Sequence, residues 1–198
     1  AARVPRSVQP GEFGLWSIVR QRIPPRHRDR PTVGFPWITS LCRMTLATMH
    51  LPHGEVVMED SARELRRHLP IWMAARGRVL VSGLGLGCVV RGLLAKPDVR
   101  HIDVVEIDHS IINRLGPEFA GIGRVRLHHG DALRFDWPAG SRWDYAWHDC
   151  WVDESLDDDG RRPEGLNVLH IQLMVRYRPM VGRQGAWAMP RSVKRFIP

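Results

Sequence analysis

The stretch VLVSGLGLG, from Val79 to Gly87, decides the fold that this sequence predicts. It starts as an apolar run typical of a buried strand and then places glycine at positions 83, 85 and 87. A helical pattern, CVVRGLLAK, follows directly. A glycine-rich turn between a strand and a helix is typical of a nucleotide-binding site.

Strand and helix patterns alternate along the chain after this turn. The strand patterns are HIDVVEID, RVRLHHGD, RWDYAWHD and QGAWAMP. Helical patterns such as HSIINRLG and GLNVLHIQLMVRYRPM stand between them. This alternation predicts an α/β fold, a doubly wound Rossmann-like parallel sheet in the strand order 3-2-1-4-5.

The chain before the glycine turn has less regular patterns. Residues 1–60 are expected to form an irregular N-terminal arm and cover segment, and residues 61–198 the Rossmann-like domain. Within the arm, FGLWSIVRQR and GEVVMED read as strands, whereas ITSLCRMTLATMHL has helical or mixed apolar spacing. SARELRRHLPIWMAARG predicts a helix that Ser61 caps and that Pro70 kinks or splits.

The spacing of the glycines discriminates between nucleotide ligands. A Walker A loop needs Lys and Ser or Thr after its last glycine, and Cys88 and Val89 stand there instead. A dinucleotide fingerprint needs its third glycine at position 88, one residue later than Gly87. The G-x-G-x-G spacing favours S-adenosylmethionine (SAM). Glu106, at the end of the next strand pattern, is suited to accept two ribose hydroxyl hydrogen bonds.

Four motifs in this order, VLVSGLGLG, VVEID, HHGDAL and WDYAWHDCW, resemble the class I SAM-dependent methyltransferase superfamily. Within it, the chain is most similar to the spermidine synthase-like branch, over roughly residues 75–190. Members of the superfamily normally end in two further strands that form an antiparallel hairpin, and no pattern for them follows QGAWAMP. The edge strand then needs cover, with which a homodimer is compatible.

The resemblance implies a cofactor site at the strand ends. Its cofactor-binding residues are Gly83, Gly85, Gly87, Glu106, Ile107, Asp131 and Ala132. Glu106 binds the ribose, Ile107 packs on the adenine, and Asp131 accepts the adenine amino group. Asp149 stands at the mouth of the site as the candidate catalytic residue.

Two group transfers from a sulfonium fit this site. Aminopropyltransferases of the branch carry a D-x-x-D element, of which Asp149 matches the first position while Val152 occupies the second and Asp153 comes one residue late. They also carry an acid in the glycine turn, where this chain has Leu86. We therefore expect a methyltransferase with a small-molecule acceptor. A spermidine synthase-like aminopropyltransferase and a non-catalytic nucleoside- or polyanion-binding protein are the alternatives.

Other polar residues near the motifs have a structural and a functional interpretation. His148 is a candidate general base, but strand alternation turns it away from Asp149, which favours a packed histidine. Glu59 and Asp60 are candidates to touch the methionyl part of the cofactor or the substrate. The acidic run DCWVDESLDDDG and Asn167 have oxygen ligands that suit Mg²⁺, although a solvated loop is favoured and no metal is expected.

Composition bounds the partners and the compartment. The net charge of +8 comes from Arg-rich ends, residues 1–30 and 176–198, through which nucleic acid binding is an option beside solvated tails. The three cysteines are scattered, as in a cytoplasmic protein with reduced thiols and no zinc site. No apolar run approaches the roughly 20 residues that cross a bilayer, and no signal peptide is visible, so no membrane partner is expected.

Overall fold

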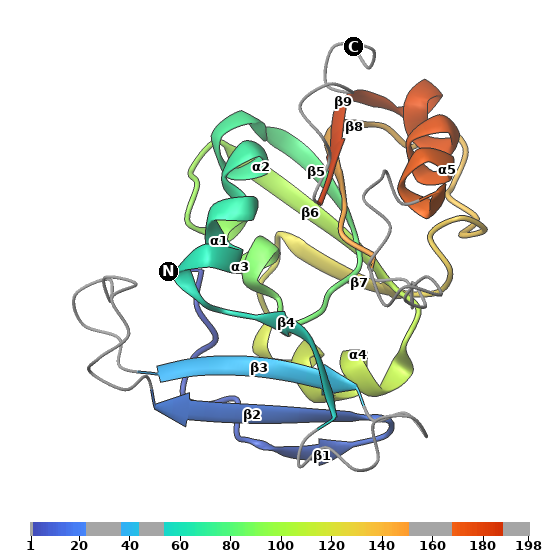
Figure 1. Ribbon diagram of the computed structural model, residues 1–198. Coiled ribbons are helices and arrows are strands. Elements are labelled where there is room, and N and C mark those ends of the chain that lie inside the picture. The colour runs from blue at the N-terminus through green and yellow to red at the C-terminus, as the bar shows by residue number, and fades with distance from the viewer. Residues whose placement is uncertain (1, 23–36, 44–53, 151–167, 188–198) are drawn as a thin grey trace, which may run out of the picture.

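The computed structural model describes residues 2–22, 37–43, 54–150 and 168–187, and its larger sheet has five parallel strands (Figure 1). The strands are β5 (Gly77–Ser82), β6 (Val99–Glu106), β7 (Val125–His129), β8 (Trp143–His148) and β9 (Val181–Ala186). Their spatial order is β7-β6-β5-β8-β9, which confirms the predicted order 3-2-1-4-5 and the Rossmann-like fold class. Residues 188–198 lie outside the described part of the chain, so the lack of a terminal hairpin stays a prediction.

Helices cover both faces of this sheet, as a doubly wound fold requires (Figure 1). The helices are α1 (Ala62–Arg67), α2 (Leu69–Ala74), α3 (Cys88–Leu94), α4 (His109–Leu115) and α5 (Val168–Tyr177), with single 3₁₀ turns η2 (Gly116–Glu118) and η3 (Arg178–Met180). Helices α2, α3 and α4 pack on one face, and α5 packs on the other against β8 and β9. No helix of the described residues combines the length and apolar character that a bilayer crossing needs.

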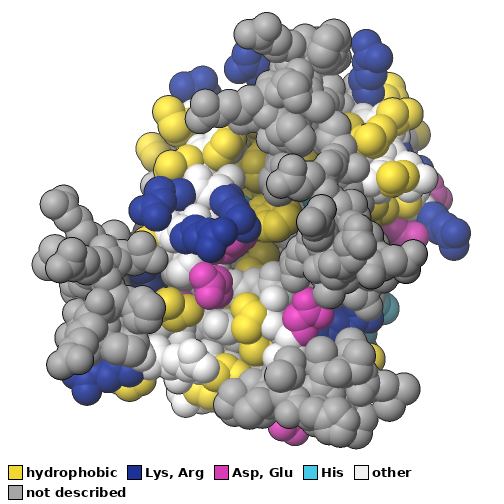
Figure 2. All heavy atoms as spheres, viewed as in Figure 1, with side chains coloured by type: hydrophobic (Ala, Val, Ile, Leu, Met, Phe, Trp, Pro, Cys, Tyr) yellow, Lys and Arg dark blue, Asp and Glu magenta, His cyan; other side chains and the backbone are white. Residues whose placement is uncertain are grey.

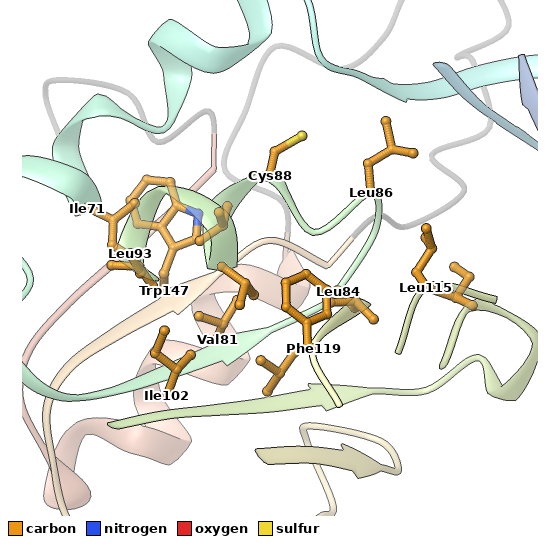
Figure 3. Packing of buried hydrophobic residues seen from close by; sticks show 14 of the residues in the cluster. Ile71, Val81, Leu84, Leu86, Cys88, Leu93, Ile102, Leu115, Phe119 and Trp147 are labelled. Carbon is orange, nitrogen blue, oxygen red and sulfur yellow. The ribbon is translucent and has the colours of Figure 1, made fainter. Parts of the chain in front are cut away.

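Side chains that alternate along the central strands build two buried clusters. Val79 and Val81 of β5 point into the larger cluster, which Figure 3 shows with Trp147 close to Ile71 of α2. Leu80 points into the smaller cluster, under α5. The central strand is therefore apolar on both faces, as expected of a parallel strand between two helical layers.

The predicted helix over residues 61–77 is split in two. Ser61 caps α1, because its hydroxyl accepts a hydrogen bond from the Glu64 amide at 3.2 Å. Pro70 lies in the first turn of α2 and has no amide hydrogen for the preceding turn, so the first helix ends at Arg67. His68 lies at this junction and is fully buried, with 0% exposure.

The N-terminal arm forms an antiparallel sheet of four strands, β1 (Gly11–Phe13), β2 (Trp16–Arg22), β3 (Trp37–Arg43) and β4 (Glu55–Glu59), in the order β1-β2-β3-β4. The prediction of an irregular arm is therefore wrong for these residues. The helical or mixed interpretation of residues 38–51 is also wrong for the part that β3 occupies. As an inner strand, β3 pairs on both sides and buries Thr39 and Ser40 together with Leu41, which hides the period-two pattern.

The two sheets share one core. Val4, Trp16 and Ile18 of the N-terminal segment belong to the same buried cluster as Val79 and Val81 of β5. The indole N–H of Trp16 also donates a hydrogen bond to the Asp108 carboxylate at 2.6 Å, next to the end of β6. The N-terminal sheet is thus fixed beside the carboxyl edge of the parallel sheet.

Candidate functional site

The carboxyl ends of the parallel strands meet around the glycine turn. The amide of Gly83 donates to the carbonyl of Val105 at 2.8 Å, and the amide of Asp149 donates to the carbonyl of Ser82 at 2.8 Å. The Gly130 amide donates to the Glu106 carbonyl at 2.9 Å. These bonds extend the ladder past the strand ends. They bring the predicted residues from three loops to one edge, where α/β sheets bind ligands.

The three glycines of the turn all have left-handed backbone angles, with φ of +93° at Gly83, +48° at Gly85 and +73° at Gly87. A side chain at Gly83 would overlap the backbone carbonyl of Asp149, and one at Gly85 would lie 2.7 Å from the sulfur of Met58. The turn therefore needs glycine both for its own conformation and for the close approach of neighbouring segments. That the glycines line a cofactor stays a prediction.

Glu106 is buried directly under the turn, with 7% exposure. Its Oε2 accepts a hydrogen bond from the Leu84 amide at 2.7 Å, and its Oε1 accepts one from the Asp108 amide at 2.9 Å. Burial raises the pKa of Glu106 against the lowering effect of these backbone bonds. The amide of Gly85 is a further backbone donor to this carboxylate. A carboxylate has about four acceptor sites, so one fixed in this way can still accept from a ribose hydroxyl.

The other predicted cofactor contacts lie beside Glu106. Ile107 is 65% exposed although it is apolar, which leaves its side chain free to cover a flat ring. Asp131 accepts a hydrogen bond from the Leu133 amide at 2.9 Å through one carboxylate oxygen. Ala132 is buried, and its carbonyl accepts from the Tyr177 hydroxyl at 2.8 Å. A fixed carboxylate, an exposed apolar side chain and a second acid fit a nucleoside.

Asp149 lies at the end of β8 with an exposed side-chain fraction of 8%. Burial raises its pKa to about 7, and the nearby charge of Glu64 acts in the same direction. His68 is a titratable neighbour of Asp149, with its Nδ1 3.8 Å from Oδ2 of Asp149. Burial lowers the pKa of His68 to about 4, with a further contribution from Arg67, so the ring is neutral at pH 7.

A second acidic side chain, Glu64 of α1, lies near Asp149. Glu64 accepts a hydrogen bond from the indole N–H of Trp187 at 2.7 Å and one from Arg67 at 3.0 Å. The Arg67 guanidinium lies over the Trp187 ring, 4.9 Å from its centroid. On the face shown in Figure 2, acidic and apolar side chains share the centre of the described surface, and Lys and Arg side chains lie beside them.

The sequence analysis did not predict that His68 and Glu64 lie near Asp149. The signal that could have indicated them is a polar residue on the buried side of a helical pattern. The candidate considered from the sequence was His148 instead. That residue is buried, lies 3.0 Å from the Ser82 hydroxyl through Nδ1, and stacks on Tyr177. The expected packed histidine is confirmed.

The remaining candidates do not join the site. Asp60 is buried and accepts hydrogen bonds from the amides of Thr39 at 2.8 Å and Val4 at 3.2 Å, so it ties the N-terminal segments together. Glu59 closes β4, opposite Ser40 of β3. The acidic run after Cys150, with Val152 and Asp153, and Asn167 lie outside the described residues. In the described ranges, no group of three or more His, Cys, Asp or Glu side chains is arranged to hold a metal ion.

Comparisons with known proteins find two kinds of transferase among the similar sequences. No family model matches the chain. It is 44% identical over 59 residues to "Ribosomal RNA small subunit methyltransferase A" of Pseudomonas fluorescens, a match that covers 30% of this chain and 21% of that protein. It is 33% identical over 124 residues to "Polyamine aminopropyltransferase" of Agathobacter rectalis, covering 57% of this chain and 41% of that protein. The chain therefore spans less than half the length of these relatives.

The solved structures that resemble the chain include two that are named as transferases. A dimethyladenosine transferase from Plasmodium falciparum has 15% identity and a TM-score of 0.41, over 61% of this chain and 39% of that one. A SAM-dependent methyltransferase from Clostridium acetobutylicum has 13% identity and a TM-score of 0.41, over 62% of this chain and 47% of that one. The sequence matches, to a methyltransferase and an aminopropyltransferase, confirm the resemblance that the motifs indicate.

Proposed function

We propose that this chain binds SAM at the glycine turn and catalyses transfer of its methyl group to an acceptor that Asp149 deprotonates. The observation that carries the proposal is the place of Asp149, a buried carboxyl with a pKa of about 7, beside Gly83 at the carboxyl edge of the sheet. The sequence similarity to methyltransferases supports the same cofactor.

Each residue of the edge has a role in this proposal. Glu106 holds the ribose, Ile107 covers the adenine, and Asp131 accepts the adenine amino group. When bound, SAM supplies an electrophilic carbon on a sulfonium. The chain has to align the acceptor, exclude water and take one proton. A carboxyl with a pKa near 7 is half ionised at neutral pH, so Asp149 is matched to that last task.

We propose a small-molecule acceptor. Asp149 is 8% exposed, and the N-terminal sheet is fixed beside the edge at which it lies, which favours a small acceptor over a macromolecule. The ribosomal RNA methyltransferase names of several relatives suggest RNA as the alternative. Each of those matches covers about a third of this chain or less. An RNA acceptor would also need its base drawn out of the stack to reach Asp149.

Aminopropyl transfer is the second candidate function, because the match to the aminopropyltransferase is the longer one, over 124 residues. Leu86 argues against aminopropyl transfer, because the glycine turn has this apolar residue where the similar enzymes carry an acid. The neighbouring acids Glu64 and Asp149 would suit an amine acceptor in methyl transfer as well as in aminopropyl transfer. A homodimer stays a proposal; among the described strands β9 pairs only with β8.

Calorimetry tests the proposal directly. We expect SAM and S-adenosylhomocysteine to bind, methylthioadenosine to bind more weakly, and Glu106→Ala to abolish binding of all three. Asp136→Ala, at an exposed position, is the matched control and keeps wild-type affinity. Absence of heat with SAM and S-adenosylhomocysteine at high micromolar concentration would refute the cofactor.

The same titrations separate the alternatives. Tighter binding of methylthioadenosine than of S-adenosylhomocysteine would favour aminopropyl transfer. Salt-dependent binding of a polyanion that survives Glu106→Ala would favour the non-catalytic protein with basic ends.

A further inference from the structure

Among the described residues, the ring of His68 has no hydrogen-bond partner. Both of its nitrogens are buried, and neither has a partner among the described residues. The indole of Trp147, two residues before Asp149, differs from this ring, because it acts on Asp149 as a hydrogen-bond donor and lowers the pKa of that carboxyl. Buried polar atoms without partners are destabilising, so a chain that keeps them at a ligand-binding edge calls for an explanation.

A second buried histidine shows that this fold can satisfy such a ring. His148 has the same full burial as His68, yet it has Ser82 and Gln184 as neighbours at 3.0 and 3.4 Å through its two ring nitrogens. His148 belongs to the packing under α5, whereas His68 faces Asp149 from the opposite side of the sheet. The difference marks His68 as a residue held in place for a partner.

The break between α1 and α2 sets the position of His68. Pro70 ends the first helix, and the junction residue is thereby turned toward the end of β8, with Nδ1 3.8 Å from Oδ2 of Asp149. That distance is longer than a hydrogen bond. Pairs of this kind are often long without substrate and tighten in the reacting complex.

We propose that His68 is a positioning residue for Asp149: its neutral ring donates Nδ1–H to the Asp149 carboxylate and orients that carboxylate toward the proton of the acceptor. The proposal rests on the transfer reaction proposed above. The step balances with the residues present. The acceptor lone pair forms the bond to carbon, the electrons of the carbon–sulfur bond stay on sulfur, and the acceptor proton goes to Asp149. His68 neither gains nor loses a proton.

Burial keeps His68 in the neutral state that this role needs, and the charge of Arg67 acts in the same direction. The titratable groups around the pair are Glu64 and Arg67 of α1, Cys88 of α3 and Cys150 after β8. Further out, Asp60 and Arg91 act on Cys88, and Glu106 and Asp131 act on Cys150. Both thiols are protonated, because burial raises the pKa of each.

Two substitutions at one position separate positioning from packing. His68→Leu keeps much of the volume and removes the donor, whereas His68→Asn keeps a donor where Nδ1 lies. We expect His68→Leu to lower kcat roughly 100-fold, the lower end of what a positioned proton acceptor contributes. Its SAM affinity should be unchanged. His68→Asn should recover most of this loss.

The pH profile of kcat distinguishes the two roles, because the loss of a merely structural residue would not shift it. A donated N–H favours the ionised carboxylate, so its loss in His68→Leu raises the pKa of Asp149. The acidic limb of the kcat profile should therefore move to higher pH in His68→Leu and stay near its wild-type position in His68→Asn. A folded His68→Leu protein with wild-type kcat and an unmoved acidic limb would overturn the proposal.

Nitrogen NMR of the imidazole tests the pair without any acceptor. We expect a neutral His68 ring with a protonated Nδ1, whose signal follows a titration near pH 7 that disappears in Asp149→Asn. Such coupling in a protein that fails to bind SAM would refute the proposed function and uphold the pair. A ring signal that ignores the titration of Asp149 would refute the pair even if methyl transfer is demonstrated.

Discussion

Asp103 and Asp149 are both buried aspartates of the parallel sheet, and their surroundings are opposite. Asp103 on β6 accepts hydrogen bonds from His128 at 2.9 Å and from the indole of Trp143 at 2.8 Å, with His101 at 3.2 Å. Asp149 at the end of β8 has a neutral histidine at 3.8 Å and an acid as its neighbours.

The two environments move the two pKa values in opposite directions. Burial alone raises the pKa of Asp103, but the hydrogen bonds from His128, Trp143 and His101 outweigh burial and hold it below its ordinary value. Burial raises the pKa of Asp149 to about 7, and the charge of Glu64 adds to the shift. The same fold thus holds one aspartate as a structural anion, whereas the raised pKa of the other is compatible with the proton transfer that we propose for it.

Asp149→Asn should have the largest effect, with a loss of activity and a gain of stability. We expect transfer to fall at least about 100-fold, because an amide accepts no proton at neutral pH. Stability at pH 8 should rise by about 4 kcal/mol, because the substitution removes an ionised carboxyl that burial disfavours. Single-turnover assays and urea unfolding measure the two effects. A less stable Asp149→Asn protein would contradict the contrast with Asp103.

Asp103→Asn should do the reverse. Its amide group cannot accept from all the donors that surround Asp103, and we expect a loss of about 4 kcal/mol of unfolding free energy, as for other broken buried charge pairs. The kcat of the folded fraction should stay at the wild-type value, because Asp103 lies under α5 and away from the glycine turn. Urea unfolding at pH 8 measures this loss of stability. An Asp103→Asn protein of normal stability but impaired transfer would contradict the structural role proposed for Asp103.

The pH dependence of stability should carry opposite signs for the two residues. The folded-state pKa of Asp149 is about 7 against an ordinary value of 3.8. Its contribution is therefore full below about pH 4 and is lost as pH rises through 7, by about 4 kcal/mol. The pKa of Asp103 is lowered, so its contribution is present above about pH 4 and is lost as pH falls further. The unfolding free energy of wild type minus that of each variant, measured from pH 3 to 8, should therefore decrease with rising pH for Asp149→Asn and increase for Asp103→Asn, so that the two differences move apart.

Gly83→Ala is a smaller test, because it pushes on the backbone of Asp149 and leaves Asp103 alone. Its added methyl would meet the Asp149 carbonyl, in addition to the strain of a left-handed φ. Gly121 has a similar φ of +81° and nothing within 4 Å of such a methyl, so Gly121→Ala measures the strain alone. We expect Gly83→Ala to be less stable than the control by about 2 kcal/mol. Equal thermal unfolding temperatures of the two variants would show that the backbone of Asp149 shifts to make room for the added methyl group.

The parallel sheet was predictable because its signals are local. The apolar run before Gly83, the acids at the ends of later strand patterns and the strand order follow from short stretches that each fold against the same sheet. Local pattern also placed Glu106 and Asp149 at one edge, since parallel strands present their carboxyl ends together.

The N-terminal sheet and His68 were not predictable in the same way. β3 is recognisable only through its partners, since Ser40 lies opposite Val19 on one side and Glu59 on the other. The importance of His68 depends on Asp149, which meets it only in the folded chain. Both features depend on pairing and contact between residues that are distant in the chain, and neither produces a periodic pattern of apolar residues in the sequence.

The shared core of the two sheets has a thermodynamic consequence. Val4, Trp16 and Ile18 lie in one apolar cluster with Val79 and Val81, so neither sheet can expose its side of that cluster without the other. Heat or denaturant should therefore melt the antiparallel and parallel sheets in one cooperative transition. A ligand that binds only the folded chain at the glycine turn should then slow amide exchange in β2 and β3 as much as in β5.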